Sequence, residues 1–150
     1  MTKKELQNKL KESMLAKDAL RTSILRMLLS AINYYEIQKG GAGYEATEED
    51  VLSVINKEAK QRHDSIKEFK SAGRQDLVDK EQKELEILQT FLPEQLPEEE
   101  VRKVVDEVVT ETGASSLQDM GKVMGALTGK LKGQADMGMV SQLVREKLNP

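Results

Sequence analysis

The 150-residue sequence contains no cysteine, no tryptophan and a single histidine. Without cysteine it forms no disulfide, performs no thiolate chemistry and cannot bind zinc through cysteine. A Ser-His-Asp triad would have to use His63, which lies among charged residues in KEAKQRHDSIKEF, a pattern typical of a solvated surface side chain. Because no set of residues assembles a catalyst, we expect neither a metal site nor a cofactor.

Long apolar runs are also missing. No run approaches the roughly 18 residues needed to span a bilayer. The first residues, MTKKELQNKLKESM, are charged and amphipathic rather than an apolar signal segment. We therefore expect a cytoplasmic protein without a membrane partner. The net charge of −3 argues against nucleic-acid binding through the overall field, so any such binding must come from a local patch.

Helical periodicity is the feature that the sequence does contain. Thr2 and Glu5 make a capping-box pattern, and Leu6, Leu10 and Met14 then share one helical face. Similar stripes recur along the chain, and no stretch alternates with a period of two. The sequence therefore predicts an all-α fold, with an N-terminal four-helix hairpin or bundle followed by a small C-terminal three-helix bundle.

Two prolines mark the expected domain boundary. Pro93 and Pro97 enclose the short link LPEQLP, and the acidic residues after Pro97 are typical of a helix start. We therefore predict an N-terminal helical domain over residues 1–93 and a C-terminal three-helix domain over residues 97–150.

Four glycines recur at helical spacing in DMGKVMGALTGKLKGQAD, residues 119–136. They are Gly121, Gly125, Gly129 and Gly133, and successive members lie about 40° apart around a helix. Lysines 122, 130 and 132 are interleaved with them, roughly opposite the apolar side that carries Val123 and Leu127. An interior glycine destabilises a helix by about 1 kcal/mol relative to alanine, so this arrangement requires an explanation.

Two explanations are open for this face. A neighbouring helix packs closely over the bare backbone, or a polyanion approaches the backbone while the lysines meet its charge. The second predicts an RNA-binding site made of Gly121, Lys122, Gly125, Gly129, Lys130, Lys132 and Gly133. A secondary basic face is expected in the first half of the chain, at Lys60, Arg62, Lys67 and Arg74.

The chain resembles the YqeY family most closely in KQRHDSIKEFKSAGRQDLVDKEQKELEILQTFLPEQL and GASSLQDMGKVMGALTGKLKGQAD. The C-terminal part of that family is similar to the tail domain of the GatB subunit of aminoacyl-tRNA amidotransferases. The residues that match the tail-domain motif are Gly121, Val123, Met124, Gly133, Ala135 and Asp136. Gln134 stands where a lysine is frequent, and Met137-Gly138-Met139 departs from the usual polar sequence.

This resemblance implies an all-helical, two-part fold. It also implies contact with tRNA, because the related tail domain contacts the tRNA elbow while chemistry occurs in other domains. The first hypothesis is thus a noncatalytic accessory module that binds tRNA or another structured RNA. The second is a protein-interaction module whose glycine face accepts a partner helix. The third, implied only by the resemblance, is carbon–nitrogen ligase activity with glutamine as amido-N-donor.

Overall fold

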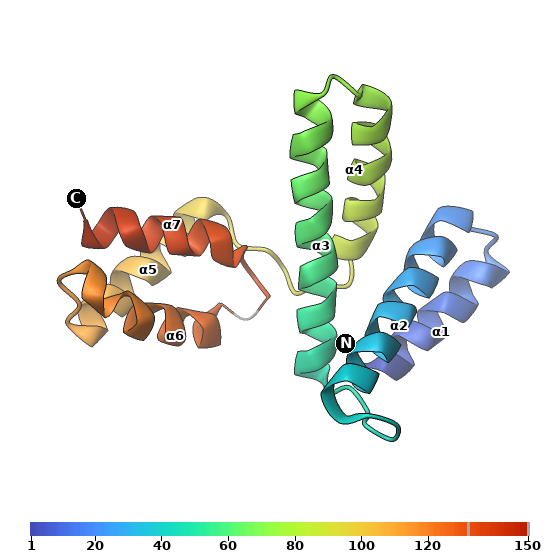
Figure 1. Cartoon of the computed structure of the whole chain (residues 1–150), viewed down its shortest axis with the longest axis horizontal. Helices are drawn as coiled ribbons and strands as arrows, with labels where there is room; N and C mark the ends of the chain where they lie inside the picture. The colour runs from blue at the N-terminus through green and yellow to red at the C-terminus, as the bar shows by residue number, and fades with distance from the viewer. Residues whose placement is uncertain (132, 150) are drawn as a thin grey trace. The chain divides into compact units, whose positions relative to one another are not determined.

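The computed structural model describes residues 1–131 and 133–149, and these residues form helices and no strand. The predicted all-α class is confirmed (Figure 1). The α-helices are α1 (Lys3–Leu15), α2 (Ala19–Gly40), α3 (Glu48–Ser71), α4 (Gln75–Gln89), α5 (Glu98–Thr112), α6 (Met120–Lys130) and α7 (Met137–Leu148), with a 3₁₀ turn, η1, at Leu117–Asp119.

The chain divides into two compact units, Met1–Leu92 and Pro93–Pro150. In the N-terminal unit, α1 packs along α2 and α3 packs along α4, each pair joined by a short turn, and α2 also contacts α3 and α4 (Figure 1). In the C-terminal unit, each of α5, α6 and α7 packs against the other two.

Local signals set several helix ends. The hydroxyls of Thr2 and Thr47 accept the amide N–H groups of Glu5 and Asp50, and both acidic side chains accept the threonine N–H in return. These reciprocal caps satisfy donors that a helix N-terminus otherwise leaves unpaired. The helix start predicted at the Thr2 capping box is confirmed.

Aliphatic side chains form the core of each unit. In the N-terminal unit, α1 to α4 bury a set that includes Leu6, Leu25, Leu28, Ile32, Val51, Ile55 and Leu88. A smaller cluster of Ala59, Ile66, Val78 and Leu85 lies between α3 and α4. In the C-terminal unit, the buried set includes Val101, Val105 and Val108 of α5, Val123 and Leu127 of α6, and Val140 and Val144 of α7.

The turn between α1 and α2 contains a strained backbone position. Lys17 has φ +56°, and it is the sole non-glycine residue with positive φ in the described part of the chain. A side chain in this left-handed conformation brings its Cβ close to the following carbonyl, a clash that glycine avoids.

We predict that Lys17→Gly raises the free energy of unfolding of the N-terminal unit by about 1 kcal/mol. Urea denaturation followed by tyrosine fluorescence measures this directly, because the three tyrosines all lie between residues 34 and 44 and the chain has no tryptophan. Lys17→Ala keeps the strain and is the control, expected to change stability by less than about 0.5 kcal/mol. A less stable Lys17→Gly protein would contradict the prediction.

Candidate nucleic-acid interface

Three glycines form an open stripe along α6. Gly121, Gly125 and Gly129 are all exposed, and a Cβ added to any of them would meet no atom within 4 Å. Val123 and Leu127, on the opposite side of the same helix, are fully buried. No other described part of the C-terminal unit therefore packs over the bare backbone, and the close helix crossing considered from the sequence does not occur within this unit. We call these three residues the glycine stripe.

Gly133 does not belong to the glycine stripe. The helix ends at Lys130, and Gly133 has φ +65°, so glycine is required there by the backbone of the loop before α7. The helical alignment expected over residues 119–136 is wrong at Leu131 and at residues 133–136, which lie outside α6. In this loop the Gly133 carbonyl accepts a hydrogen bond from the Gln95 side chain, and the Gln134 carbonyl accepts the Leu96 N–H at 2.9 Å.

The lysines beside the stripe reach the end of α5. Lys122 Nζ donates to the carbonyl of Thr112 at 3.2 Å, and Lys130 Nζ pairs with Glu111 at 3.1 Å. A cation at a helix C-terminus interacts favourably with the helix dipole, so both lysines have a structural role. They remain at least partly exposed beside the stripe. Lys132, the third predicted lysine, lies outside the described residues.

The four residues of the expected secondary basic face do not share one environment. Lys60 and Lys67 are exposed on α3. The Arg62 side chain is only 16% exposed, because its guanidinium lies between Glu58 at 2.6 Å and Glu84 of α4 at 3.6 Å. Arg74 pairs with Asp76 at 3.1 Å in the turn before α4. Arg62 thus connects α3 to α4 and contributes no cation to an exposed surface.

A polar cluster around Asp50 was not predicted as a site. This buried carboxylate accepts hydrogen bonds from Tyr35 Oη at 2.8 Å, Lys39 Nζ at 2.8 Å and Tyr44 Oη at 2.6 Å, as well as from the Thr47 N–H at 3.0 Å. A Cβ at Gly40 would lie 2.7 Å from the Cβ of Tyr44, so glycine is needed for this ring to approach α2.

The partners of Asp50 explain its charge state. The Lys39 ammonium first, and then the Tyr44 hydroxyl and the Thr47 N–H, hold the pKa of the Asp50 carboxyl far below its usual range. The same hydrogen bond to Asp50 raises the pKa of Tyr44. Because this carboxylate accepts hydrogen bonds from four donors, we assign it a structural role in stabilising the connection between α2 and α3. The sequence signal for this cluster was the four-residue spacing of Tyr35 and Lys39, which places both side chains on one face of α2.

Glu36 also stabilises the connection between α2 and α3. Its carboxylate accepts Lys3 Nζ of α1 at 2.7 Å and the Ala46 N–H at 2.8 Å. The Lys3 hydrogen bond, followed by that of Ala46, lowers the pKa of this buried carboxyl. Glu36 thereby joins α1, α2 and the loop before α3.

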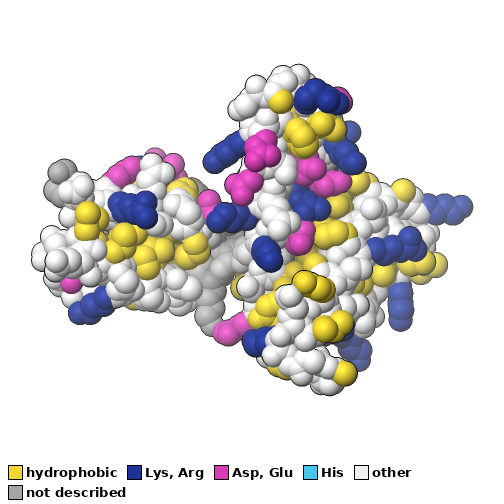
Figure 2. Space-filling model, in the orientation of Figure 1, with side chains coloured by type: hydrophobic (Ala, Val, Ile, Leu, Met, Phe, Trp, Pro, Cys, Tyr) yellow, Lys and Arg dark blue, Asp and Glu magenta, His cyan; other side chains and the backbone are white. Residues whose placement is uncertain are grey.

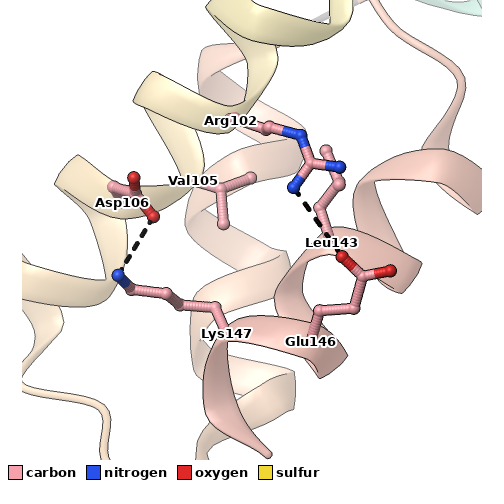
Figure 3. Close-up of a pocket in the computed structure, with 6 residues that line it drawn as sticks. All are labelled: Arg102, Val105, Asp106, Leu143, Glu146 and Lys147. Carbon is pink, nitrogen blue, oxygen red and sulfur yellow. Dashed lines mark ion pairs between the residues drawn. The ribbon is translucent and has the colours of Figure 1, made fainter. Parts of the chain in front are cut away.

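A solvent-open groove lies between α5 and α7 in the C-terminal unit (Figure 3). Val105 and Leu143 form its apolar lining. Two ion pairs cross it, one from Arg102 to Glu146 at 3.7 Å and one from Lys147 to Asp106 at 3.4 Å. These four charges neutralise one another across the groove. Among the described residues, no three histidine, aspartate or glutamate side chains converge as a metal site.

Comparison with known proteins identifies the family. The family model described as Yqey-like protein matches residues 3–148. This chain belongs to the YqeY family. It is 35% identical over 132 residues to "Altered inheritance of mitochondria protein 41, mitochondrial" of Saccharomyces cerevisiae, with 83% of this chain and 69% of the yeast protein covered. Proteins of the same name from Lachancea thermotolerans and Vanderwaltozyma polyspora are 39% and 29% identical, over 74% and 95% of this chain and 59% and 79% of their own lengths.

These relatives contradict the expected cytoplasmic location of this YqeY-family chain, because all three are named as mitochondrial proteins. The expectation depended on the absence of an apolar signal segment. Mitochondrial targeting segments are instead amphipathic and basic, so that test did not address a mitochondrial location.

We predict that Gly125→Ala raises the free energy of unfolding of the C-terminal unit of this YqeY-family chain by about 1 kcal/mol, because the new methyl group meets no atom and alanine favours the helix. Urea denaturation followed by circular dichroism measures it. The control Gly113→Ala should destabilise by about 1 kcal/mol or more, since Gly113 ends α5 at φ +66°. Loss of stability in Gly125→Ala would show that the stripe is covered.

For the Asp50 cluster, we predict that Tyr35→Phe lowers the free energy of unfolding by about 1.5 kcal/mol, since it removes a hydrogen bond to an ionised carboxylate. The neighbouring Tyr34→Phe is a matched control. Tyr34 is exposed, and its hydroxyl accepts a hydrogen bond from the exposed Gln38 side chain, so a change below about 0.5 kcal/mol is expected. Equal effects of the two substitutions on urea denaturation would argue against a structural role for the cluster.

Proposed function

We propose that this chain is a noncatalytic accessory module that binds tRNA or another structured RNA through the glycine stripe of α6. The observation that carries this proposal is that Gly121, Gly125 and Gly129 are exposed, and that a Cβ added at any of them would meet no described atom within 4 Å. Gly125 lies in the interior of α6 and destabilises this helix by about 1 kcal/mol relative to alanine, whereas Gly121 and Gly129 lie in its first and last turns. No described packing within the C-terminal unit requires a glycine at any of the three positions. A ligand that approaches the backbone closely does require them.

The composition of residues 93–150 favours a structured RNA over a single strand. This segment contains no Phe, Tyr or Trp, so it has no aromatic ring on which an unpaired base could stack. It also contains ten acidic and seven basic residues, so attraction must be local to the stripe. Lys122 supplies that local charge, because its ammonium contacts only a backbone carbonyl among the described residues, and Lys130 lies exposed beside it in its ion pair with Glu111. The bare backbone permits contact with phosphates or with the flat face of a base pair.

A protein partner is the second candidate, because partly exposed apolar side chains lie near the glycine stripe. Leu117 is exposed at the start of this segment, and Met120 and Met124 are only partly buried. Flexible methionines adapt to varied partners, so the glycine stripe and these side chains suit the packing of a partner helix. The carbon–nitrogen ligase activity remains an implication of the resemblance alone.

Fluorescence anisotropy with bulk tRNA, at two salt concentrations, tests the RNA proposal. We predict saturable binding that weakens steeply with salt. Gly125→Leu should reduce the affinity at least tenfold, because its side chain projects into the contact, while the folded state is retained. The double variant Lys122→Gln/Lys130→Gln should weaken binding and flatten its salt dependence.

Matched controls separate the stripe from general effects. Thr110→Leu adds the same side chain at an exposed position of α5, and Lys103→Gln removes an exposed cation of α5. Both should leave the affinity unchanged. The RNA proposal fails if wild-type protein does not bind tRNA at low salt, or if Gly125→Leu binds as wild type does. Loss of a protein contact in Gly125→Leu, with that contact kept in the lysine variant, would favour the second candidate.

We also propose that the two units are separate domains over residues 1–93 and 97–150, a four-helix bundle and a three-helix bundle. The separate aliphatic clusters within Met1–Leu92 and within Pro93–Pro150 support this division.

A further inference from the structure

The turn between α1 and α2 exposes large apolar side chains. Leu15 is 86% exposed and Met14 49% exposed at the end of α1, and Leu20 is exposed at the start of α2. We call Met14 to Leu20 the hairpin end. A leucine side chain with this exposure contributes little hydrophobic free energy to folding. Burying it against a binding partner would therefore favour binding.

Cations surround the hairpin end. Residues 9–26 contain five basic and two acidic side chains. No carboxylate in the described chain lies within ion-pair distance of Lys11, Lys17 or Arg26, and the Arg26 guanidinium instead reaches Met14 Sδ at 4.0 Å. Of the acids, the Asp18 carboxylate caps α2 by accepting the Arg21 N–H, and Glu12 lies on α1.

The far end of the same hairpin is different. There Lys3 and Lys39 are paired with the buried carboxylates of Glu36 and Asp50. Figure 2 shows blue and yellow side chains, with little magenta, over the part of the N-terminal unit that holds α1 and α2, whereas magenta side chains are frequent over α3 and α4. Unpaired positive charge and exposed apolar area thus coincide at the hairpin end.

The backbone of the hairpin end adds an independent observation. Lys17 takes the left-handed conformation at φ +56°, where glycine would be relaxed. An exposed lysine is therefore kept at the apex of the turn despite a cost to stability. Strain of this kind is commonly retained where a side chain has a role in binding.

We propose that the hairpin end is a peripheral contact site for an anionic lipid bilayer. Leu15 and Met14 enter the boundary between headgroups and acyl chains, and Lys11, Lys17 and Arg26 meet the lipid phosphates. None of the helices in the described residues could span a membrane. The proposal revises the sequence-based expectation of no membrane partner. RNA phosphates would attract the same cations, but they would leave the exposed leucine in water.

Flotation with lipid vesicles tests this proposal on the full chain. Wild-type protein should float with vesicles of phosphatidylcholine and phosphatidylglycerol at low salt, and not with phosphatidylcholine alone. Leu15→Ser should weaken this binding about tenfold or more, the change expected when one leucine no longer leaves water. Lys11→Gln and Arg26→Gln should each weaken it about fivefold.

Two further variants exclude misfolding as the cause. Ile37→Ser is the matched control, because Ile37 is 65% exposed on α2 and lies about 25 Å along that helix from the turn. It should bind vesicles as wild type does. Lys17→Gly relaxes the backbone and removes a cation, so it should bind vesicles less well although its fold is not weakened.

Several results would overturn the proposal. They are the absence of flotation with anionic vesicles, equal binding to neutral vesicles, and equal losses in Leu15→Ser and Ile37→Ser. Loss of tRNA affinity in Lys11→Gln and Arg26→Gln, with vesicle binding unchanged, would instead assign the hairpin end to RNA. The outcome is independent of the proposed glycine-stripe function, because Gly125→Leu should leave flotation unchanged.

Discussion

The carboxylate of Asp50 organises the N-terminal unit. A buried ionised group is tolerated only when its charge and its lone pairs are satisfied, and here one ammonium, two phenol hydroxyls and one backbone N–H do so. These donors come from the last turns of α2 and from the following loop, which ends at Thr47, the N-cap of α3. The hydrogen bonds to this one carboxylate therefore fix the path of the chain between α2 and α3, which connects the α1–α2 pair to the α3–α4 pair. Glu36 extends the constraint to α1 through Lys3.

The C-terminal unit depends on a different constraint. Its core is purely aliphatic, and α6 contributes only a narrow apolar side to it. Burying Val123 and Leu127 turns the glycines to the outside, while Lys122 and Lys130 reach the carbonyl end of α5. The same packing that stabilises the unit therefore leaves the bare backbone of α6 uncovered within it.

The two proposed binding surfaces use different chemistry. The glycine stripe offers close approach to backbone with modest local charge, which suits a broad, rigid polyanion. The hairpin end offers flexible apolar side chains among unpaired cations, which suits a bilayer surface. Membership of the YqeY family is shown by the match over residues 3–148, and neither surface is assigned by that membership.

The sequence by itself determined the helical class, the helix start at Thr2 and the two sides of α6, because periodicity and capping are properties of neighbouring residues. It did not predict the left-handed turn at Gly133, which removed that residue from the stripe. Only the tertiary structure decided which polar groups meet: Arg62 with Glu84 across two helices, Lys130 with Glu111, and four donors around Asp50. Exposure was also a tertiary outcome, because an open glycine stripe and a solvated Leu15 depend on which surfaces the other helices leave uncovered.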